Sequence, residues 1–250
     1  MNTITIATPV HNRGWILPYF LKHLYNINYD KKKINLYFLL NNSSDNSENL
    51  LNEFKSNHNT EYNSIQIEKY KTSYKFEDSR TSSIRSKYTY NHLSKTRNKI
   101  LSTNSSDYLL SVDSDVLVPP NILVNLLVHK KDIVSALLYN GYEMYPDEYW
   151  KYPNILNIES GKIKHFYNWH IKNAQILSKS KLYQVDITGA VVLMSKEVTK
   201  KTKYSWHIQG EDVAWSLDCK NNGFNLYCDV GVYCQHIMNE KMLMQKGEGI

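Results

Sequence analysis

Two carboxylates, Asp113 and Asp115, stand two residues apart directly after the apolar run Tyr108–Val112. Carboxylates this close repel one another unless a cation neutralises them, and their oxygens suit Mn²⁺ or Mg²⁺. A cation bound through one or two carboxylates keeps coordination positions for substrate phosphates. A solvated turn that caps the following helix is the alternative, but the position after a buried strand favours a metal site.

A second acidic pair, Glu211 and Asp212, opens the predicted helix 210–223. Acidic residues in a first helical turn interact favourably with the helix dipole by about 0.3–1 kcal/mol, which is the purely structural explanation. The pair also follows a glycine and an aromatic-rich segment. We therefore interpret it as functional, with the dipole effect present as well.

The elements that must position these acids alternate along the chain. Apolar runs predict strands, and helical spacing of apolar residues predicts the helices between them. The predicted strands are Thr3–Ala7, Ile34–Leu40, Ser64–Tyr70, Asp107–Val112, Ile133–Tyr139, Val185–Ser195 and Phe224–His236. The predicted helices are Trp15–Leu24, Glu48–Phe54, His92–Leu101, Pro119–Asp132, Lys196–Lys201 and 210–223. This order predicts an α/β domain with a mainly parallel central sheet and helices on both faces.

Three segments lack usable periodicity. Lys71–Tyr90 is rich in Ser, Tyr, Arg and Lys and is predicted to be a long loop. Asn140–Leu182 is aromatic and polar without a clear pattern, and Ile237–Ile250 is predicted to be a tail. We expect the loop and the tail to become ordered over a bound ligand.

Composition limits the possible partners. The 250 residues fit one domain, and 30 Lys+Arg against 24 Asp+Glu give a net charge of +6 without a block of five like charges, so no nucleic-acid surface is predicted. The three cysteines lack Cys-x-x-Cys spacing; Cys228, Cys234 and His236 could ligate zinc, but core packing explains the thiols better. With no signal peptide and no membrane span, a cytoplasmic protein is expected.

Five motifs follow one another along the chain: ITIATPVHNRGWILPYFLKHL, YFLLNNSSDNSENLL, LSKTRNKIL, DYLLSVDSDVLVPPNIL and GEDVAWSLDCKNNGFNLYCD. Their order resembles that of nucleotide-sugar glycosyltransferases with the GT-A fold, most of all the family 2 group. The stretch from Tyr74 to Leu138 is also similar to collagen galactosyltransferase and Anp1-type mannosyltransferase domains. The resemblance covers Thr3–His236.

The resemblance implies a single GT-A domain at 1–236, with a nucleotide-binding half at about 1–118, an acceptor-binding half at about 119–236 and a tail at 237–250. It implies a hexosyltransferase that takes a UDP- or GDP-linked sugar and an acceptor on a glycan, protein or lipid. The Asp-x-Asp pair and a late histidine would hold Mn²⁺ or Mg²⁺; these are Asp113, Asp115 and His236.

The resemblance also implies a set of nucleotide-sugar contacts: Thr8, Pro9, His11, Arg13, Asn42, Asp45, Arg97, Asn98, Asp113, Ser114 and Gly189. Asn42 stands where many relatives carry an aspartate, which leaves the base open because an amide both donates and accepts. Asp45 has helix capping as an equal alternative, Arg97 has a surface cation, and Gly189 has ordinary strand packing.

In inverting relatives the second acid of the late helix is the general base, so Asp212 is the candidate base with Glu211 beside it. A retaining GT-A transferase remains open. A sugar nucleotidyltransferase would need a glycine-rich, basic loop after the first strand, and Thr8–Gly14 is poor in both. A carbohydrate-binding module would not require the two acidic pairs and the late histidine together.

Overall fold

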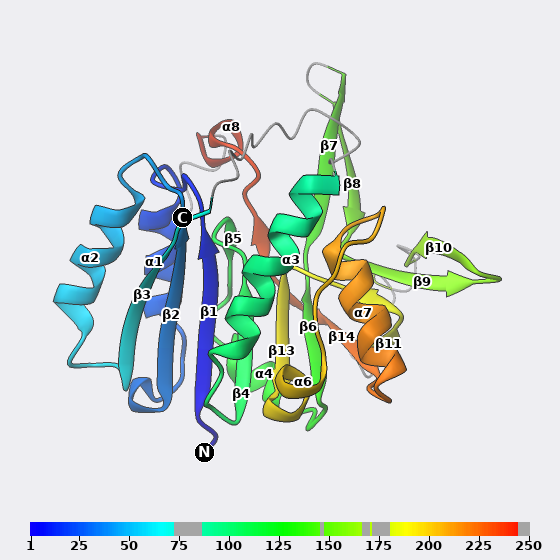
Figure 1. Cartoon of the computed structure of the whole chain (residues 1–250), viewed down its shortest axis with the longest axis horizontal. Coiled ribbons are helices and arrows are strands. Elements are labelled where there is room, and N and C mark those ends of the chain that lie inside the picture. The colour runs from blue at the N-terminus through cyan, green and yellow to red at the C-terminus, as the bar shows by residue number, and fades with distance from the viewer. Residues whose placement is uncertain (73–86, 146–147, 167–170, 172–180, 245–250) are drawn as a thin grey trace.

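The computed structural model describes residues 1–72, 87–145, 148–166, 171 and 181–244. An eight-stranded sheet forms its centre, in the order β11-β14-β6-β13-β4-β1-β2-β3 (Figure 1). The strands are β1 (Ile4–Val10), β2 (Ile34–Asn41), β3 (Ser64–Tyr70), β4 (Tyr108–Val112), β6 (Ile133–Leu137), β11 (Leu182–Val185), β13 (Val191–Ser195) and β14 (Leu226–Tyr233).

Six of these strands run in one direction, while β13 and β11 run in the opposite one. β13 is antiparallel to both β4 and β6, and β11 is antiparallel to β14. The other pairings are parallel. The prediction of an α/β domain with a mainly parallel sheet is confirmed, and the antiparallel β13 brings its amino end to the edge where β4 and β6 have their carboxyl ends.

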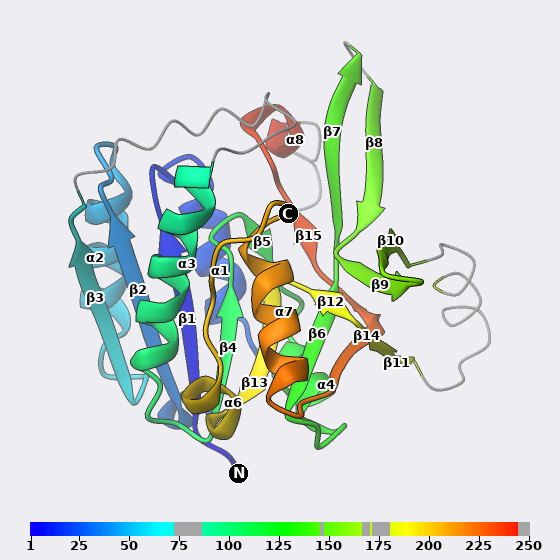
Figure 2. The same ribbon diagram turned by 45° about the vertical axis from the view of Figure 1, so that its right-hand side comes forward.

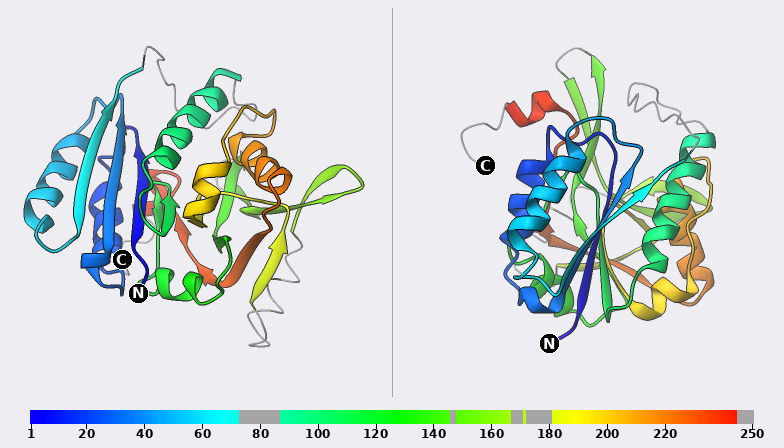
Figure 3. Two further views of the ribbon diagram at one scale, coloured as in Figure 1. Left: turned by 60° about the horizontal axis from the view of Figure 1, so that its bottom comes forward. Right: turned by 60° about the vertical axis from the view of Figure 1, so that its left-hand side comes forward.

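Helices cover both faces of the sheet, as the right-hand view of Figure 3 shows. One core cluster includes buried side chains of α1 (Leu17–Tyr25), α2 (Ser47–His58) and α4 (Ile122–Leu127). The other includes side chains of α3 (Lys87–Ser102), α6 (Lys196–Lys201) and α7 (Glu211–Asn221).

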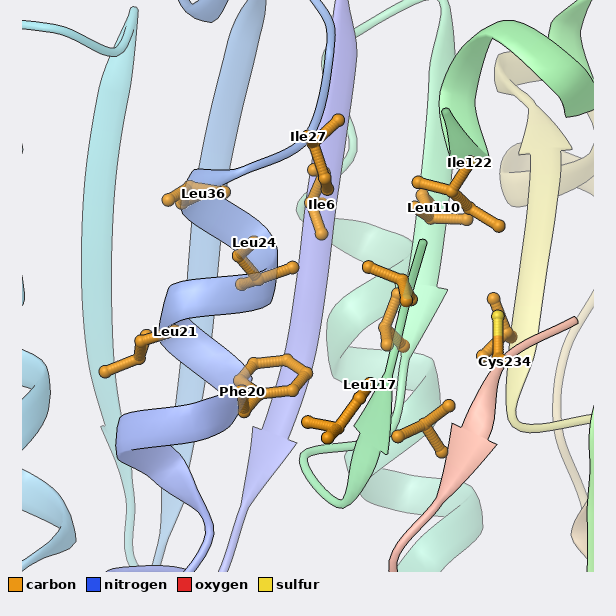
Figure 4. Packing of buried hydrophobic residues seen from close by; sticks show 14 of the residues in the cluster. Ile6, Phe20, Leu21, Leu24, Ile27, Leu36, Leu110, Leu117, Ile122 and Cys234 are labelled. Atoms are coloured by element: carbon orange, nitrogen blue, oxygen red, sulfur yellow. The ribbon is translucent and has the colours of Figure 1, made fainter. Parts of the chain in front are cut away.

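Alternation along the strands supplies both clusters. Ile6 and Leu36 pack on the α1 side with Phe20 and Leu24 (Figure 4). Ala7 belongs to the cluster on the α3 and α7 side. Each large aliphatic or aromatic side chain that is fully buried contributes about 1.5–3 kcal/mol. Because helices cover both faces, the central strands bury apolar side chains on both sides, and their sequences are continuous apolar runs.

Several elements differ from the prediction. β1 continues through Pro9 to Val10, because β4 pairs with it only as far as Ala7 and a proline on the unpaired side loses no ladder hydrogen bond. The predicted strand Val185–Ser195 is broken, with β12 (Ile187–Thr188) separated from β13 by Gly189 and Ala190.

Additional elements appear where periodicity was lacking. The aromatic segment forms β7 (Tyr139–Tyr145), β8 (Glu148–Pro153), β9 (Ile155–Glu159) and β10 (Lys162–His165), which pair as hairpins. α3 begins at Lys87, so the last part of the predicted loop is helical; residues 73–86 lie outside the described residues. The predicted tail contains α8 (Glu240–Met244), and residues 245–250 lie outside the described part.

One short pairing joins distant parts of the chain. β15 (Gln235–His236) is antiparallel to β5 (Val116–Leu117), with His236 opposite Val116. The late histidine is thereby placed next to the Asp-x-Asp segment. Among the helices of the described residues, none has the length and apolar character needed to cross a membrane.

Candidate active site

The predicted site residues gather at the edge of the sheet where β1, β2 and β4 end. The carboxyl ends of parallel strands are where open α/β sheets bind ligands. The first turn of α7 lies at this edge beside β12, as Figure 2 shows. Chain segments that are far apart in sequence therefore supply side chains to one region.

Asp113 lies against the buried guanidinium of Arg97. Arg97 comes from α3, and its Nη2 is 2.7 Å from Asp113 Oδ1, although the N–H groups do not point along this line, so the contact is mainly Coulombic. Arg97 Nη1 is also 3.4 Å from Ser111 Oγ. Burial by itself lowers the pKa of Arg97, but Asp113 and then Asp212 more than offset this and hold the pKa above its usual range. The alternative of a surface cation is thus wrong.

Asp115 lies between an arginine and a histidine. Its Oδ2 is 3.5 Å from Nη2 of Arg13, which extends from the loop after β1, and its Oδ1 is 3.5 Å from Nε2 of His236. The neighbouring backbone ties the same strands, since the amide of Ile237 donates to the Asp115 carbonyl at 2.9 Å. Asp115 is buried at 4% exposure, and Ser114 is buried between the two acids.

Some of the side chains at this edge could ligate a divalent cation. His236 Nδ1 lies 2.9 Å from Asn140 Oδ1, to which it can only donate, so Nε2 is left to face Asp115 either as a metal ligand or as a second N–H. Four carboxylates and two guanidinium groups share this edge, two more negative charges than positive. Among the described residues, no three His, Cys, Asp or Glu side chains form a ready-made metal cluster, so phosphate oxygens would have to complete the coordination.

Asp212 lies directly over the backbone of Gly189. A Cβ atom built on Gly189 would be 2.1 Å from Asp212 Oδ2, which is far inside contact distance. Glycine is therefore required here by the carboxylate, and simple strand packing does not account for it. Glu211 is buried beside it at 6% exposure, and both acids contribute to the field around Arg97.

A serine one helical turn later sets the position of Asp212. Ser216 Oγ accepts from the amide of Thr188 at 3.3 Å and donates to the Thr188 carbonyl at 3.4 Å. Positions four apart lie on the same helical face, so this pairing places Asp212 over the residue after Thr188. Thr188 Oγ1 in turn donates to Ser135 Oγ on β6 at 2.8 Å.

The candidate nucleotide residues on the other side of the edge form their own polar network. His11 Nδ1 donates to the Asn41 carbonyl at 2.6 Å, and the Asn41 amide donates to His92 Nε2 at 2.6 Å. The Asn41 Oδ1 and Thr8 Oγ1 atoms are buried and accept no hydrogen bond among the described residues. Pro9 is partly buried at the end of β1.

Three predicted nucleotide residues are engaged with the protein backbone. Asn42 donates to the Thr72 carbonyl at 2.9 Å and accepts from the Thr72 amide at 3.1 Å. Asn98 pairs in the same two-way manner with the backbone of Tyr204, at 2.8 Å in both directions. Asp45 accepts from the amides of Gly14 at 2.7 Å and Ser47 at 3.0 Å, so it anchors the start of α2.

These hydrogen bonds indicate structural roles for Asp45, Asn98 and Asn42. Burial raises the pKa of Asp45, but the hydrogen bonds from Ser47 and Gly14 outweigh it and leave the pKa below its usual value. Asp45 is not the N-cap of α2, which is Asn46; its carboxylate instead accepts from the amide of Ser47, the first residue of the helix. Asn98 holds the backbone of Tyr204 in the segment that leads into α7, and Asn42 holds that of Thr72 just after β3. Both side chains therefore position backbone segments that surround the site.

Sequence reasoning missed several residues of this region. Ser216 could have been found from its spacing of four from Asp212, since both must share a helix face. Asn140 and His92 gave no signal, because each is an isolated polar residue in an irregular or amphipathic segment. The three cysteines are buried free thiols, and burial raises the pKa of Cys228 to about 12.

Comparison with known proteins gives a family-level match over nearly the whole chain. The sequence model described as "Glycosyltransferase family 25, N-terminal domain" matches residues 1–238. A search of curated proteins found no significant sequence match.

Solved structures share the fold at low identity. A mannosyltransferase from Pyrobaculum calidifontis, PcManGT, in complex with GDP-Man and Mn²⁺, superposes with a TM-score of 0.59 at 12% identity, covering 94% of this chain and 56% of that one. Residues 1–349 of S. aureus TarS in complex with UDP-GlcNAc give 0.58 at 12% identity, covering 96% and 60%. The chain thus spans less than two thirds of either. The prediction of a GT-A fold is confirmed.

Proposed function

The chain belongs to the family described as glycosyltransferase family 25, N-terminal domain, and on that basis we propose that it transfers a sugar from a nucleotide-diphosphate sugar to an acceptor hydroxyl. The donor is proposed to be UDP- or GDP-linked, because the two superposed structures are complexes with UDP-GlcNAc and GDP-Man. The acceptor is a hydroxyl group on a glycan, a protein or a lipid-linked saccharide.

One observation carries the proposal: the buried Arg97 joins the Asp-x-Asp segment to the first turn of α7. Its guanidinium is 2.7 Å from Asp113 and lies in the field of Asp212, which in turn lies over Gly189. A donor diphosphate near the Asp-x-Asp segment would thus lie close to a carboxylate that can accept a proton. The missing Cβ of Gly189 leaves the space that this carboxylate occupies.

The proposed step is a direct displacement at the anomeric carbon. The acceptor oxygen forms the new C–O bond as the anomeric carbon–diphosphate oxygen bond breaks, and the electron pair leaves with the diphosphate. The acceptor proton goes to a carboxylate oxygen of Asp212, which acts as general base. The product then has inverted anomeric configuration, because the attack comes from the face opposite the leaving group.

A divalent cation, Mn²⁺ or Mg²⁺, would be held by Asp115 and His236 with Asp113 beside them, and when bound it would offset the charge that develops on the leaving diphosphate. Asn140 keeps Nδ1 of His236 protonated and so presents Nε2. Arg13 and Arg97 would supply fixed positive charge on either side of the phosphates.

Two variants separate donor binding from chemistry. Asp115→Asn should lower the cation-dependent thermal stabilisation by UDP or GDP, because a ligating charge is lost, and turnover should fall with it. Asp212→Asn should keep that stabilisation and lose about 10²–10⁴-fold in kcat, since it removes only the proton acceptor. Nucleotide release from a panel of UDP- and GDP-sugars, with water or added acceptors, provides the activity measurement.

The matched control is Asn104→Ala, at the opposite end of β4, where Asn104 Nδ2 contacts Thr199 Oγ1 at 3.3 Å and Oδ1 accepts from Ser106. It should leave both nucleotide binding and turnover unchanged. Unaltered turnover in Asp212→Asn would rule out this base, and a retained anomeric configuration in the product, seen by NMR, would rule out direct displacement.

A further inference from the structure

The connection between β12 and β13 is a tight, strained turn. The amide of Val191 donates to the carbonyl of Gly189, two residues earlier, at 2.9 Å, and Ala190 between them has φ +66°. A γ-turn with positive φ is rare and unfavourable for a residue that carries a Cβ atom. Such a conformation persists only where the surroundings hold it, so its neighbours indicate what it does.

The turn, residues 189–191, contacts both acidic centres of the site. The carbonyl of Ala190 accepts from the amide of Asp113 at 3.2 Å, so it fixes the backbone of the Asp-x-Asp segment. On the other side, the Cα atom of Gly189 lies against the carboxylate of Asp212. The spacing between the candidate metal-binding acid and the candidate base therefore depends on this turn.

A single buried amide holds the turn from behind. Asn154 Nδ2 donates to the Gly189 carbonyl at 3.1 Å and to the Ala136 carbonyl at 3.0 Å, and its Oδ1 accepts from the Leu138 amide at 3.0 Å. Asn154 is only 7% exposed. Its side chain thus fastens the turn to the end of β6, and all three hydrogen bonds are to backbone.

We propose that Asn154 is a positioning residue, which holds the 189–191 turn so that Asp212 and Asp113 keep the separation needed for sugar transfer. The inference rests on the proposed function. Only a side chain with two N–H donors and one acceptor in a plane satisfies this set of backbone groups. Alanine satisfies none of them, and a neutral aspartic acid supplies one donor and one acceptor.

The first test is Ala190→Gly, because glycine adopts φ +66° without strain. This variant should unfold at the same temperature as the wild type or higher. Its kcat should stay within about twofold of the wild type, because Asn154 still holds a turn that is no longer strained. A tenfold loss of kcat would overturn the proposal, since Asn154 would then not be sufficient to hold the turn.

Asn154→Ala and Asn154→Asp supply the second test. The kcat should decrease from the wild type to Asn154→Asp to Asn154→Ala, with nucleotide affinity in calorimetry retained. Asn104→Ala, which removes two hydrogen bonds at the far end of the sheet, controls for lost stability. If Asn154→Ala lowers kcat no more than Asn104→Ala does, Asn154 has no positioning role.

Failure of the proposed function has a different signature. If the wild type releases no nucleotide from any UDP- or GDP-sugar, the sugar-transfer assignment fails. Crystal structures of the wild type and Asn154→Ala then decide the positioning role: displacement of the Gly189 carbonyl together with the Asp212 carboxylate supports it, and an unmoved pair overturns it.

Discussion

At the scale of single residues, the site depends on glycine at position 189. Gly189 has no Cβ, and the Asp212 carboxylate occupies the space that a Cβ would need. The requirement is mutual, because Asp212 keeps its place only while residue 189 is glycine. Arg97 adds the compensating charge that lets buried acids accumulate here, since unpaired buried charges are strongly unfavourable.

Gly189→Ala should therefore abolish turnover and destabilise the fold by about 1–3 kcal/mol through overpacking. The same substitution in an Asp212→Ala background should be far less destabilising, because the clashing carboxylate is gone. Urea unfolding of the four proteins in this double-mutant cycle measures the coupling. Additive free energies would show that the two residues do not compete for one space.

At the scale of elements, α7 is defined at both ends by glycines with positive φ. Gly210 precedes the helix with φ +120°, and a Cβ atom built on it would lie 3.7 Å from the ring of Tyr90 on α3. Gly223 follows the helix with φ +83°, and a Cβ atom there would have no atom within 4 Å. Glu211 and Asp212 stand at the first of these ends. The Ser216–Thr188 pair fixes the helix against β12 between these ends.

The two ends should respond differently to the same substitution. Gly223→Ala should lower the free energy of unfolding by about 1–2 kcal/mol, from backbone strain alone, and leave kcat unchanged. Gly210→Ala should lower both the free energy of unfolding and kcat, because strain there shifts Glu211 and Asp212. Gly161→Ala, with φ +75° and no atom within 4 Å of the new Cβ, controls for the backbone cost in the β9–β10 turn. A drop in kcat for Gly223→Ala would contradict this division.

At the scale of the whole molecule, folding stability should depend on a buried neutral histidine. His92 is 5% exposed and accepts from Asn41 through Nε2. Burial first, and then the charges of His11 and Lys95, lower its pKa from the ordinary 6.5. The unfolded chain therefore binds the proton more readily, so stability is lost as the pH falls below about 6.5 towards the lower folded value.

His92→Gln should flatten this dependence. Urea unfolding between pH 5 and pH 8 would show a smaller loss of stability on the acid side than in the wild type. A residual slope should remain, because burial also lowers the pKa of His165. An identical slope in wild type and variant would show that His92 does not account for the acid sensitivity.

Much of this organisation was predictable from local pattern. Apolar runs and helical spacing identified the strands and helices, because burial on one or both faces leaves a periodic trace in neighbouring residues. The run Tyr108–Val112 followed by two aspartates marked one acidic centre, and the glycine-flanked α7 marked the other. The broken strand at Gly189 and Ala190 escaped prediction, since small apolar residues read the same in a strand and in a tight turn.

The sequence by itself thus determined the fold class, the order of the elements and the two acidic pairs. Only the tertiary structure decided that β13 runs antiparallel and returns its first residues to the Asp-x-Asp edge, that His236 joins Asp115 through β15 and β5, and that Asn154 holds the turn between the acids. These contacts join residues tens to more than a hundred positions apart. Long-range pairing is chosen by the packing of the whole chain, so it leaves no periodic signal in any one segment.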